Sequence, residues 1–396
     1  MSKDWEVKKL KDVCQIRPPK KESKEELLED DKVSFVPMGD LGVLTKNFTV
    51  KQEKTFKEVY KGYTYFREED VLLAKITPCF ENGKLGIARN LKNGIGFGSS
   101  EYIVIRSKED LIPDYLYYFL SKKNFRLNGQ KVMTGAVGHK RVPLKFVENT
   151  EIPYPNNLSE QHRIVNIIEE AFNAIDKAKE NAKINFQNAI QFFESYLQRI
   201  VANPGTDWEE KKLGEVCDLY QGLAINAKTK HLLVEKSDLP LLRIKDLKNG
   251  TVEQYIDSNN YPEKSLVNEE DIIYTRTGQI GLVYTGRYGV LHNNSFKVVP
   301  KESLLREYLY WFLQNKSFKS QIIRLSSKTA QPDITHKIFK EQTVFVPSEA
   351  EQKQIAEKLD LFYAESKNLE DIYRQKLTNL DELKESILQK AFNGEL

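Results

Sequence analysis

The sequence contains few residues that could form a disulfide or bind a metal. Its 396 residues include three cysteines, Cys14, Cys79 and Cys217, which lie far apart and lack Cys-x-x-Cys spacing. This pattern predicts neither a disulfide framework nor a zinc ribbon. The five histidines are scattered and show no His-Glu-x-x-His spacing. We therefore expect no metal site and no cofactor held by this chain itself.

Long hydrophobic runs and a large net charge are also absent. No apolar stretch approaches the ~18 residues of a membrane helix, and the first residues lack the apolar core of a signal peptide. The 60 Lys and Arg residues nearly balance 57 Asp and Glu residues, which leaves a net charge of +3. A nucleic-acid surface would therefore have to be local. We expect a cytoplasmic protein that does not bind a membrane.

The most regular feature of the sequence is a pair of long predicted helices, residues 157–203 and 348–393. In both, apolar or small residues recur in steps of four and three, the heptad pattern of a coiled coil. Two helices with such narrow apolar faces should pair with each other, and we expect an antiparallel pair. The heptad positions are Ile164, Ile168, Ala171, Ile175, Ala178, Ala182, Ala189, Phe192 and Tyr196 in the first helix and Ile355, Leu359, Phe362, Leu369, Tyr373, Leu380, Leu383 and Ile387 in the second.

The chain repeats itself. Both long helices begin with a capping-box sequence, in which a cap side chain and a Glu three residues later satisfy free amides of the first turn. Cys14 and Cys217 occupy matching places, and we expect both to be small buried hydrophobic residues rather than reactive thiols. The matched segments are Asp4–Leu10 with Asp207–Leu213, Asn157–Glu160 with Ser348–Glu351, Asp114–Leu120 with Glu307–Leu313, and Glu194–Gln198 with Glu385–Gln389.

The repeat predicts an α+β protein in which two globular domains of similar fold are separated by two long antiparallel coiled-coil helices, as a pseudo-twofold internal repeat. Each globular domain should contain a small, mostly antiparallel sheet and a helix packed by its aromatic face. The predicted domains are 1–155, 156–205, 206–346 and 347–396. The predicted strands are 71–76, 102–105, 272–274 and 296–299, and the predicted short helices are 114–128 and 306–319.

Two sequence features suggest catalysis, and both have a simpler explanation. The glycine-rich segment 94–98 leads into a predicted strand, whereas a dinucleotide loop needs a helix N-terminus to supply its amides. Glu69 and Asp70 with Lys75 could form a nuclease cluster, but these residues flank a predicted buried strand. An adenine-methylase motif, Asn-Pro-Pro-aromatic, is also absent. We therefore predict that the isolated chain neither cleaves nor methylates DNA.

Polar loops suggest binding instead. Lys, Arg, Asn, Gln, Ser and Thr follow or precede the predicted strands in both repeats, where cations could contact phosphates and Arg, Asn or Gln could contact base edges. A solvated surface loop is the alternative explanation for each one, but recurrence in both repeats favours two binding domains built on one frame. The candidate DNA-binding residues are Lys75, Thr77, Asn82, Lys84, Arg89, Ser99, Ser100, His139, Lys140, Arg141, Arg276, Thr277, Gln279, Asn293, Asn294, Lys328, Thr329 and Gln331.

Over its full length the chain resembles the specificity subunits of type I restriction–modification systems. The resemblance rests on the Asp-Trp-Glu-x-Lys-Lys-Leu opening of each half, on residues 152–155 leading into Glu160-Gln161-x-Arg163-Ile164, and on the ending 388–396. The segment 344–347 departs from the pattern, because it lacks the first proline of Ile-Pro-x-Pro.

The resemblance implies the function and the partners. Each globular domain would read one half of a split, asymmetric site in double-stranded DNA. The helices would pair, set the spacing and bind two methyltransferase subunits, which carry S-adenosylmethionine; restriction subunits, which use ATP and Mg, would join that core. Ile164, Ile168, Ile175, Ile355, Leu359, Phe362 and Ile387 should form the helix pair. Apolar residues expected on the outer faces, for a partner subunit, are Phe172, Ile190, Phe193, Leu361, Ile372 and Leu388.

Two other functions are compatible with parts of the sequence. A coiled-coil spacer could hold two domains that bind ligands other than DNA, or the chain could be a fused nuclease or methylase. DNA affinity that falls steeply with salt would separate a DNA reader from the spacer. Methyl transfer by the purified chain alone would support the enzyme.

Overall fold

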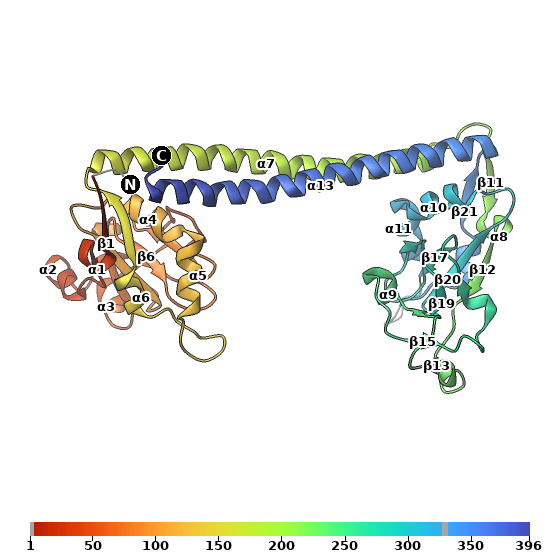
Figure 1. The fold of residues 1–396 in the computed structure, drawn as a ribbon, viewed down its shortest axis with the longest axis horizontal. Coiled ribbons are helices and arrows are strands. Elements are labelled where there is room, and N and C mark those ends of the chain that lie inside the picture. The colour runs from red at the N-terminus through yellow and green to blue at the C-terminus, as the bar shows by residue number, and fades with distance from the viewer. Residues whose placement is uncertain (1–3, 327–331) are drawn as a thin grey trace. The chain divides into compact units, whose positions relative to one another are not determined.

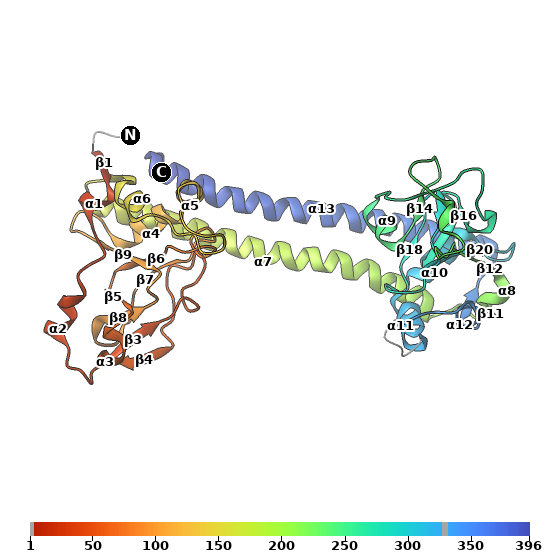
Figure 2. The ribbon, with the colours of Figure 1, turned by 90° about the horizontal axis from the view of Figure 1, so that it is seen from below.

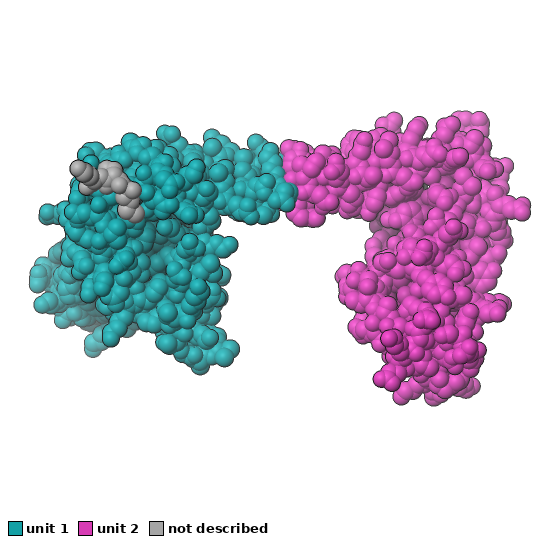
Figure 3. Space-filling model, in the orientation of Figure 1, with its two compact units in different colours: residues 1–182, 375–396 teal, residues 183–374 magenta. Residues whose placement is uncertain are grey.

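A computed structural model describes residues 4–326 and 332–396. The chain divides into two compact units (Figure 3). Unit 1 comprises residues 1–182 and 375–396, and unit 2 comprises residues 183–374. The two long helices are confirmed as α7 (Leu158–Ala202) and α13 (Glu349–Asn393). Each unit therefore contains one globular part, one stretch of α7 and one stretch of α13.

The main sheet of unit 1 has four antiparallel strands in the order β2-β9-β6-β7. Its strands are β2 (Cys14–Ile16), β9 (Tyr102–Ser107), β6 (Val71–Ala74) and β7 (Leu85–Ile87). The central strands β6 and β9 are buried at almost every position and confirm the two strands predicted from apolar runs. Helix α4 (Pro113–Ser121) packs on this sheet.

A second sheet in unit 1 has the order β4-β3-β8-β5. Its strands are β4 (Gln52–Thr55), β3 (Lys32–Val36), β8 (Ile95–Gly98) and β5 (Thr64–Arg67), and β3 and β8 run parallel. The glycine-rich segment is therefore a strand. A Cβ on Gly96 would lie 2.1 Å from the Phe66 ring, so this glycine serves close packing. The remaining elements of unit 1 are β1 (Trp5–Lys9), α1 (Leu10–Val13), α2 (Ser23–Glu26), α3 (Phe56–Tyr60), α5 (Lys123–Lys131), α6 (Leu144–Asn149) and β10 (Glu151–Pro155), with β1 paired to β10.

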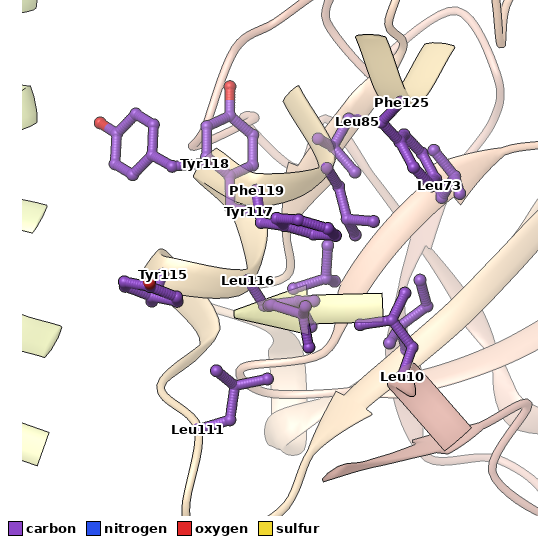
Figure 4. Packing of buried hydrophobic residues seen from close by; sticks show 14 of the residues in the cluster. Leu10, Leu73, Leu85, Leu111, Tyr115, Leu116, Tyr117, Tyr118, Phe119 and Phe125 are labelled. Atoms are coloured by element: carbon purple, nitrogen blue, oxygen red, sulfur yellow. The ribbon is translucent and has the colours of Figure 1, made fainter. Parts of the chain in front are cut away.

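The core of unit 1 is built around α4. Its Tyr115, Leu116 and Phe119 are buried together with Leu10, Leu73 and Leu85, and Figure 4 shows these side chains around the helix. Phe392 of α13 joins the same cluster, with its ring centroid 4.9 Å from that of Tyr115. The end of the second long helix is thus part of the core of the first globular block.

Unit 2 repeats this main sheet in the order β12-β20-β17-β18. The strands are β12 (Cys217–Gln221), β20 (Ser295–Pro300), β17 (Ile272–Thr275) and β18 (Val283–Tyr284), and β17 and β20 confirm the predicted buried strands. Its other elements are β11 (Glu209–Lys212), α8 (Leu213–Val216), β13 (Leu233–Val234), β14 (Leu241–Leu242), α9 (Ile244–Asn249), β15 (Tyr255–Ile256), β16 (Leu266–Val267), β19 (Gly289–Leu291), α10 (Arg306–Gln314), α11 (Lys316–Leu325), α12 (His336–Lys340) and β21 (Thr343–Val346). Smaller sheets join β14-β19-β16 and β13-β15, and β11 pairs with β21.

The prediction of one continuous helix over 114–128, and of another over 306–319, was wrong. Each helix breaks in two: α4 ends before Lys122 and α10 ends before Asn315, where the backbone is extended with ψ of 136° and 132°. The Asn315 side chain accepts hydrogen bonds from the amides of Ser317 and Phe318 and so caps α11. The break lets the second helix turn and bury Phe125 in unit 1 and Phe318 in unit 2.

Within each unit the stretches of α7 and α13 run antiparallel and side by side (Figures 1 and 2). In unit 1, Lys179 contacts Asp381 at 2.6 Å and Lys384 contacts Asp176 at 2.6 Å. In unit 2, the Ser366 hydroxyl donates to the carbonyl of Ala189 at 2.8 Å. Higher numbers on one helix meet lower numbers on the other in both units, which confirms the expected antiparallel orientation.

Candidate nucleic-acid interface

Three segments of unit 1 meet beyond the end of strand β6. The amide of Thr77 donates to the carbonyl of Lys140 at 2.9 Å, the amide of Val142 donates to Lys75 at 2.9 Å, and the amide of Lys75 donates to Glu101 at 2.9 Å. These bonds join the segment after β6, the segment before β9 and the loop between α5 and α6. We call their meeting point the unit 1 edge. It brings together seven predicted residues, Lys75, Thr77, Ser99, Ser100, His139, Lys140 and Arg141.

The cations of the unit 1 edge are arranged around Glu101. Arg141 donates through Nε and Nη2 to the two carboxylate oxygens of Glu101, at 2.9 and 2.8 Å. Lys75 lies 3.9 Å from the same carboxylate and donates to the carbonyl of Ser100 at 2.9 Å. The hydrogen bond from Arg141 lowers the pKa of Glu101, so the carboxylate is ionised at neutral pH. Burial lowers the pKa of the Lys75 ammonium.

Sequence reasoning missed one cation at this edge. Arg17 follows β2 and is exposed, and its amide donates to the carbonyl of Val104 in β9 at 2.8 Å. Its charge acts on Lys75 and helps to lower the pKa of that ammonium. A positive φ of 58° holds the backbone of Arg17 in a left-handed conformation. The signal that could have identified Arg17 from the sequence is its position, as a basic residue directly after a strand of the repeated sheet.

Lys84 and Arg89, which we also predicted to bind DNA, are held by other parts of unit 1. Lys84 donates to the carbonyl of Met38 at 2.7 Å. Arg89 forms ion pairs with Glu69 at 2.9 Å and Asp114 at 2.5 Å, and Asp114 also binds Lys46 at 2.8 Å. Burial opposes the ionisation of Asp114, but these two cations outweigh it and lower its pKa. Asn82 is exposed. A DNA contact by these three residues stays a prediction.

Unit 2 has an equivalent meeting point beyond β17, the unit 2 edge. The amides of Arg276 and Thr277 donate to the carbonyl of Asn294 at 2.9 and 3.4 Å, and the amide of Ile334 donates to the carbonyl of Arg276 at 3.1 Å. Arg276, Thr277, Asn293 and Asn294 are thus brought together, and Gln279 is exposed nearby in the same loop. Lys328, Thr329 and Gln331 lie outside the residues that the structure describes.

The Arg276 side chain is fixed from two sides. Its Nε donates to Asp333 Oδ1 at 2.8 Å, and its Nη2 donates to the other oxygen of that carboxylate. Its Nη1 donates to Gln221 Oε1 at 3.0 Å. Gln221, at the end of β12, also donates to the carbonyl of Asn293 at 2.7 Å. Sequence reasoning missed both Gln221 and the role of Asp333, because neither is adjacent to Arg276 in the chain.

The residues predicted to form the helix pair are buried or partly buried. Ile164, Ile168, Ile175 and Leu359 are at most 5% exposed, Ile355 and Ile387 are partly buried against the unit cores, and Phe362 packs on Tyr196 with a centroid distance of 4.5 Å.

The expectation that Phe172, Phe193 and Leu388 face a partner was wrong. Phe172 packs edge-on against Tyr118 with 5.9 Å between the ring centroids, and Phe193 packs edge-on against Trp311 with 5.3 Å. Leu388 lies in the unit 1 core. Ile190 is half-buried. Leu361 and Ile372 remain 59% and 50% exposed.

The nuclease cluster considered from the sequence does not form in the described part of the chain. No three His, Cys, Asp or Glu residues there could together hold a metal ion. Asp70, which we considered for a nuclease cluster, is fully buried and binds Arg106 through two hydrogen bonds of 2.7 and 2.8 Å. None of the described helices combines the length and the apolar character required to cross a membrane.

The sequence matches a known family model. Residues 2–185 and 205–378 match the model described as the type I restriction modification DNA specificity domain. The chain is 37% identical to the EcoAI specificity subunit of Escherichia coli over 195 residues, which are 49% of this chain and 32% of that protein. It thus spans about a third of this relative's length. It is 24% identical to the MjaVIII specificity subunit of Methanocaldococcus jannaschii over 99% of this chain and 93% of that protein.

Solved structures share the fold. A chain from a structural study of complex assembly and conformational transition of the type I R-M system superposes with a TM-score of 0.80 at 20% identity, over 100% of this chain and 99% of that one. The HsdS subunit from Thermoanaerobacter tengcongensis superposes with a TM-score of 0.72 at 19% identity, over 100% and 98%. These similarities establish the arrangement of elements within the two repeats.

Proposed function

Because the chain belongs to the family of type I restriction modification DNA specificity domains, we propose that it is the DNA specificity subunit of a type I restriction–modification enzyme. In this role residues 1–155 and 206–346 are target recognition domains, each of which reads one half of a split site in double-stranded DNA. Residues 156–205 and 347–396 are the helices between them. The chain acts in the cytoplasm, where the DNA is.

One observation carries this proposal: the same frame presents polar side chains at equivalent edges of both units, mainly cations and hydroxyls in unit 1 and an arginine with amide side chains in unit 2. Lys75 and Arg276 both follow a central strand, and their amides donate to the segment before the neighbouring strand at 2.9 Å. Lysine and arginine suit phosphates, while Arg, Asn and Gln suit base edges. A duplicated frame with different loop residues is what two readers of different half-sites need.

The proposed partners supply the chemistry. We infer that two methyltransferase subunits, which hold S-adenosylmethionine, bind the outer faces of the helices, where Leu361 and Ile372 are exposed. Restriction subunits, which use ATP and Mg, complete the enzyme. This chain contributes recognition and positioning only, and it needs no cofactor of its own.

The test is an exchange of residues 1–155 for the first block of another specificity subunit. The chain and its exchange variant are each co-expressed with the methyltransferase, and methylated positions are mapped on genomic DNA. We expect one half of the methylated site to change and the other half to stay the same. An unchanged site, or a change in both halves, would contradict independent recognition. Methylation by the chain alone would contradict its non-catalytic role.

A further inference from the structure

In each unit an arginine at the recognition edge is held by a carboxylate through two parallel hydrogen bonds. Arg141 uses Nε and Nη2 to bind Glu101 at 2.9 and 2.8 Å. Arg276 uses the same two nitrogens to bind Asp333, with Nε at 2.8 Å from Oδ1. Such bidentate pairing fixes the plane of the guanidinium as well as its position.

The two pairs share one equivalent position in the repeated frame, which holds the arginine in unit 1 and the carboxylate in unit 2. Arg141 and Asp333 both lie in the segment that precedes the last short helix, and each forms an isolated bridge with the segment after the central strand, Arg141 with Ile76 and Asp333 with Thr277. The partner comes from the same end of the main sheet but from neighbouring strands, since Glu101 precedes β9 and Arg276 follows β17. The pair is therefore present in both units while its polarity is reversed.

Stability does not explain these pairs well. The Arg141 and Glu101 side chains are 45% and 23% exposed, and those of Arg276 and Asp333 are 21% and 30% exposed. Ion pairs in contact with solvent contribute little to folding. A carboxylate is also unfavourable beside a DNA backbone, because it repels phosphates. Its presence at both edges calls for a role in recognition.

We propose that Glu101 and Asp333 determine specificity by restraining the arginines that face DNA. Each carboxylate offsets the charge of its arginine, so the arginine gains little from a phosphate of any sequence. It also fixes the guanidinium plane, so the remaining N–H groups match a base edge in one orientation only. Specificity is a difference between two affinities, and weakening the non-specific one raises it. This inference rests on the proposed function.

The test uses the full chain in complex with its methyltransferase subunits. Binding of Glu101→Gln and Asp333→Asn is measured on a duplex that contains the methylated site and on a duplex without it, over a series of salt concentrations. We expect non-specific affinity to rise and the ratio of specific to non-specific affinity to fall by roughly tenfold, as removing a charge that repels phosphates allows one more of them to be neutralised. The salt slope should steepen by about one.

Matched controls remove a carboxylate outside the edges. Glu29→Gln in unit 1 and Glu209→Gln in unit 2 cause the same charge change in exposed ion pairs, with Lys57 at 2.9 Å and Lys211 at 2.7 Å. They should leave the affinity ratio unchanged. In addition, Glu101→Gln should relax only the half-site read by unit 1, and Asp333→Asn only the other half-site.

A double variant tests whether the restraint of the arginine by its carboxylate, and not a disturbance of folding, causes the change in specificity. Glu101→Arg combined with Arg141→Glu gives unit 1 the polarity of unit 2, and it should keep the original salt slope. The proposal is overturned if Glu101→Gln and Asp333→Asn behave like their controls, or if they weaken non-specific binding. If the unmodified complex shows no preference for any site, the proposed function fails instead.

Discussion

Gln161 and Gln352 show how closely the two units correspond. Each is buried in the first turn of a long helix. Gln161 donates to the carbonyls of Asp110 and Pro155 at 2.7 and 2.9 Å and accepts from the amide of Ile112 at 3.0 Å. Gln352 makes the equivalent three bonds. It donates to the carbonyls of Ser303 and Pro347, both at 3.0 Å, and accepts from the amide of Leu305 at 2.7 Å.

The buried frames of the two units agree, but the side chains at the unit 1 edge and the unit 2 edge differ. The unit 1 edge carries the cations Arg17, Lys75, Lys140 and Arg141, of which Lys75 and Arg141 contact Glu101. The unit 2 edge carries one arginine, Arg276, with Asp333 and the amide side chains of Gln221, Asn293 and Asn294. Apolar packing and buried hydrogen bonds restrict the frame, because an unpaired buried polar group is costly. Loop side chains have no such restriction, so they are free to differ between two readers.

The largest effect should come from the helix ends that enter the cores. Leu388 is 3% exposed in unit 1, and Leu197, its counterpart in the repeat, is 5% exposed in unit 2. Leu388→Ala and Leu197→Ala should each lower the free energy of unfolding by about 2–5 kcal/mol, because each removes buried methyl groups and leaves a cavity. Denaturant unfolding measures the change. Leu361→Ala, at an exposed position of α13, is the control and should change little.

Substitution of the two buried glutamines should cause the next largest loss of stability. Gln161→Ala and Gln352→Ala each leave two carbonyls and one amide without their partner, which should cost about 2–4 kcal/mol in either unit. Thermal or denaturant unfolding gives the comparison, and the exposed neighbours His162→Ala and Lys353→Ala serve as controls. A large loss in one unit and none in the other would show that the frames are not equivalent.

Arg276→Ala should act on recognition at the unit 2 edge. It should weaken binding to the specific site by about 1–3 kcal/mol and relax one position of one half-site, if the guanidinium reads a base edge. Competition binding with duplexes that vary one base pair at a time measures this. Arg276→Lys keeps the charge but loses the planar fork, so it should not restore discrimination. Full restoration by lysine would indicate a phosphate contact.

Lys140→Ala should affect all sequences alike. Lys140 is exposed at the unit 1 edge, and a lysine that contacts a phosphate contributes affinity without sequence preference. Binding to specific and non-specific duplexes should weaken equally, and the salt slope should fall by about one. Lys145→Ala, an exposed lysine of α6, provides a comparison. Loss of discrimination with an unchanged slope would assign Lys140 to a base instead.

The smallest effect concerns the matched cysteines. Burial raises the pKa of Cys14 and of Cys217 to about 12. Both thiols therefore stay protonated at pH 8, and the protonated form does not react with alkylating reagents. Mass spectrometry after alkylation of the native chain should find half-buried Cys79 modified first. Equally slow modification of Cys14 and Cys217 is expected if they occupy equivalent buried positions in the two units. Fast reaction of either thiol would contradict this equivalence.

Much of the fold could be predicted because its signals are periodic or repeated. The heptad positions located both long helices, and apolar runs located β6, β9, β17 and β20. The breaks at Lys122 and Asn315 were missed because the aromatic pattern continues across them and tertiary packing turns the chain there. Phe172 and Phe193 were placed on the wrong face, since a residue outside the heptad pattern can still be covered by the globular block of its own unit.

The duplication, the two long helices with their heptad pattern, the family and the polar character of the loops can all be recognised from the sequence alone. These properties depend on local periodicity and on order along the chain. Which loops meet, and how their charges pair, depends on contacts that form only in the folded chain. Arg276 and Asp333 are far apart in sequence, and so are Glu101 and Arg141; the hydrogen bonds of the folded sheet bring each pair together. The restraint that we propose at these edges is therefore a property of the fold, because a guanidinium is restrained only by a carboxylate that folding places beside it.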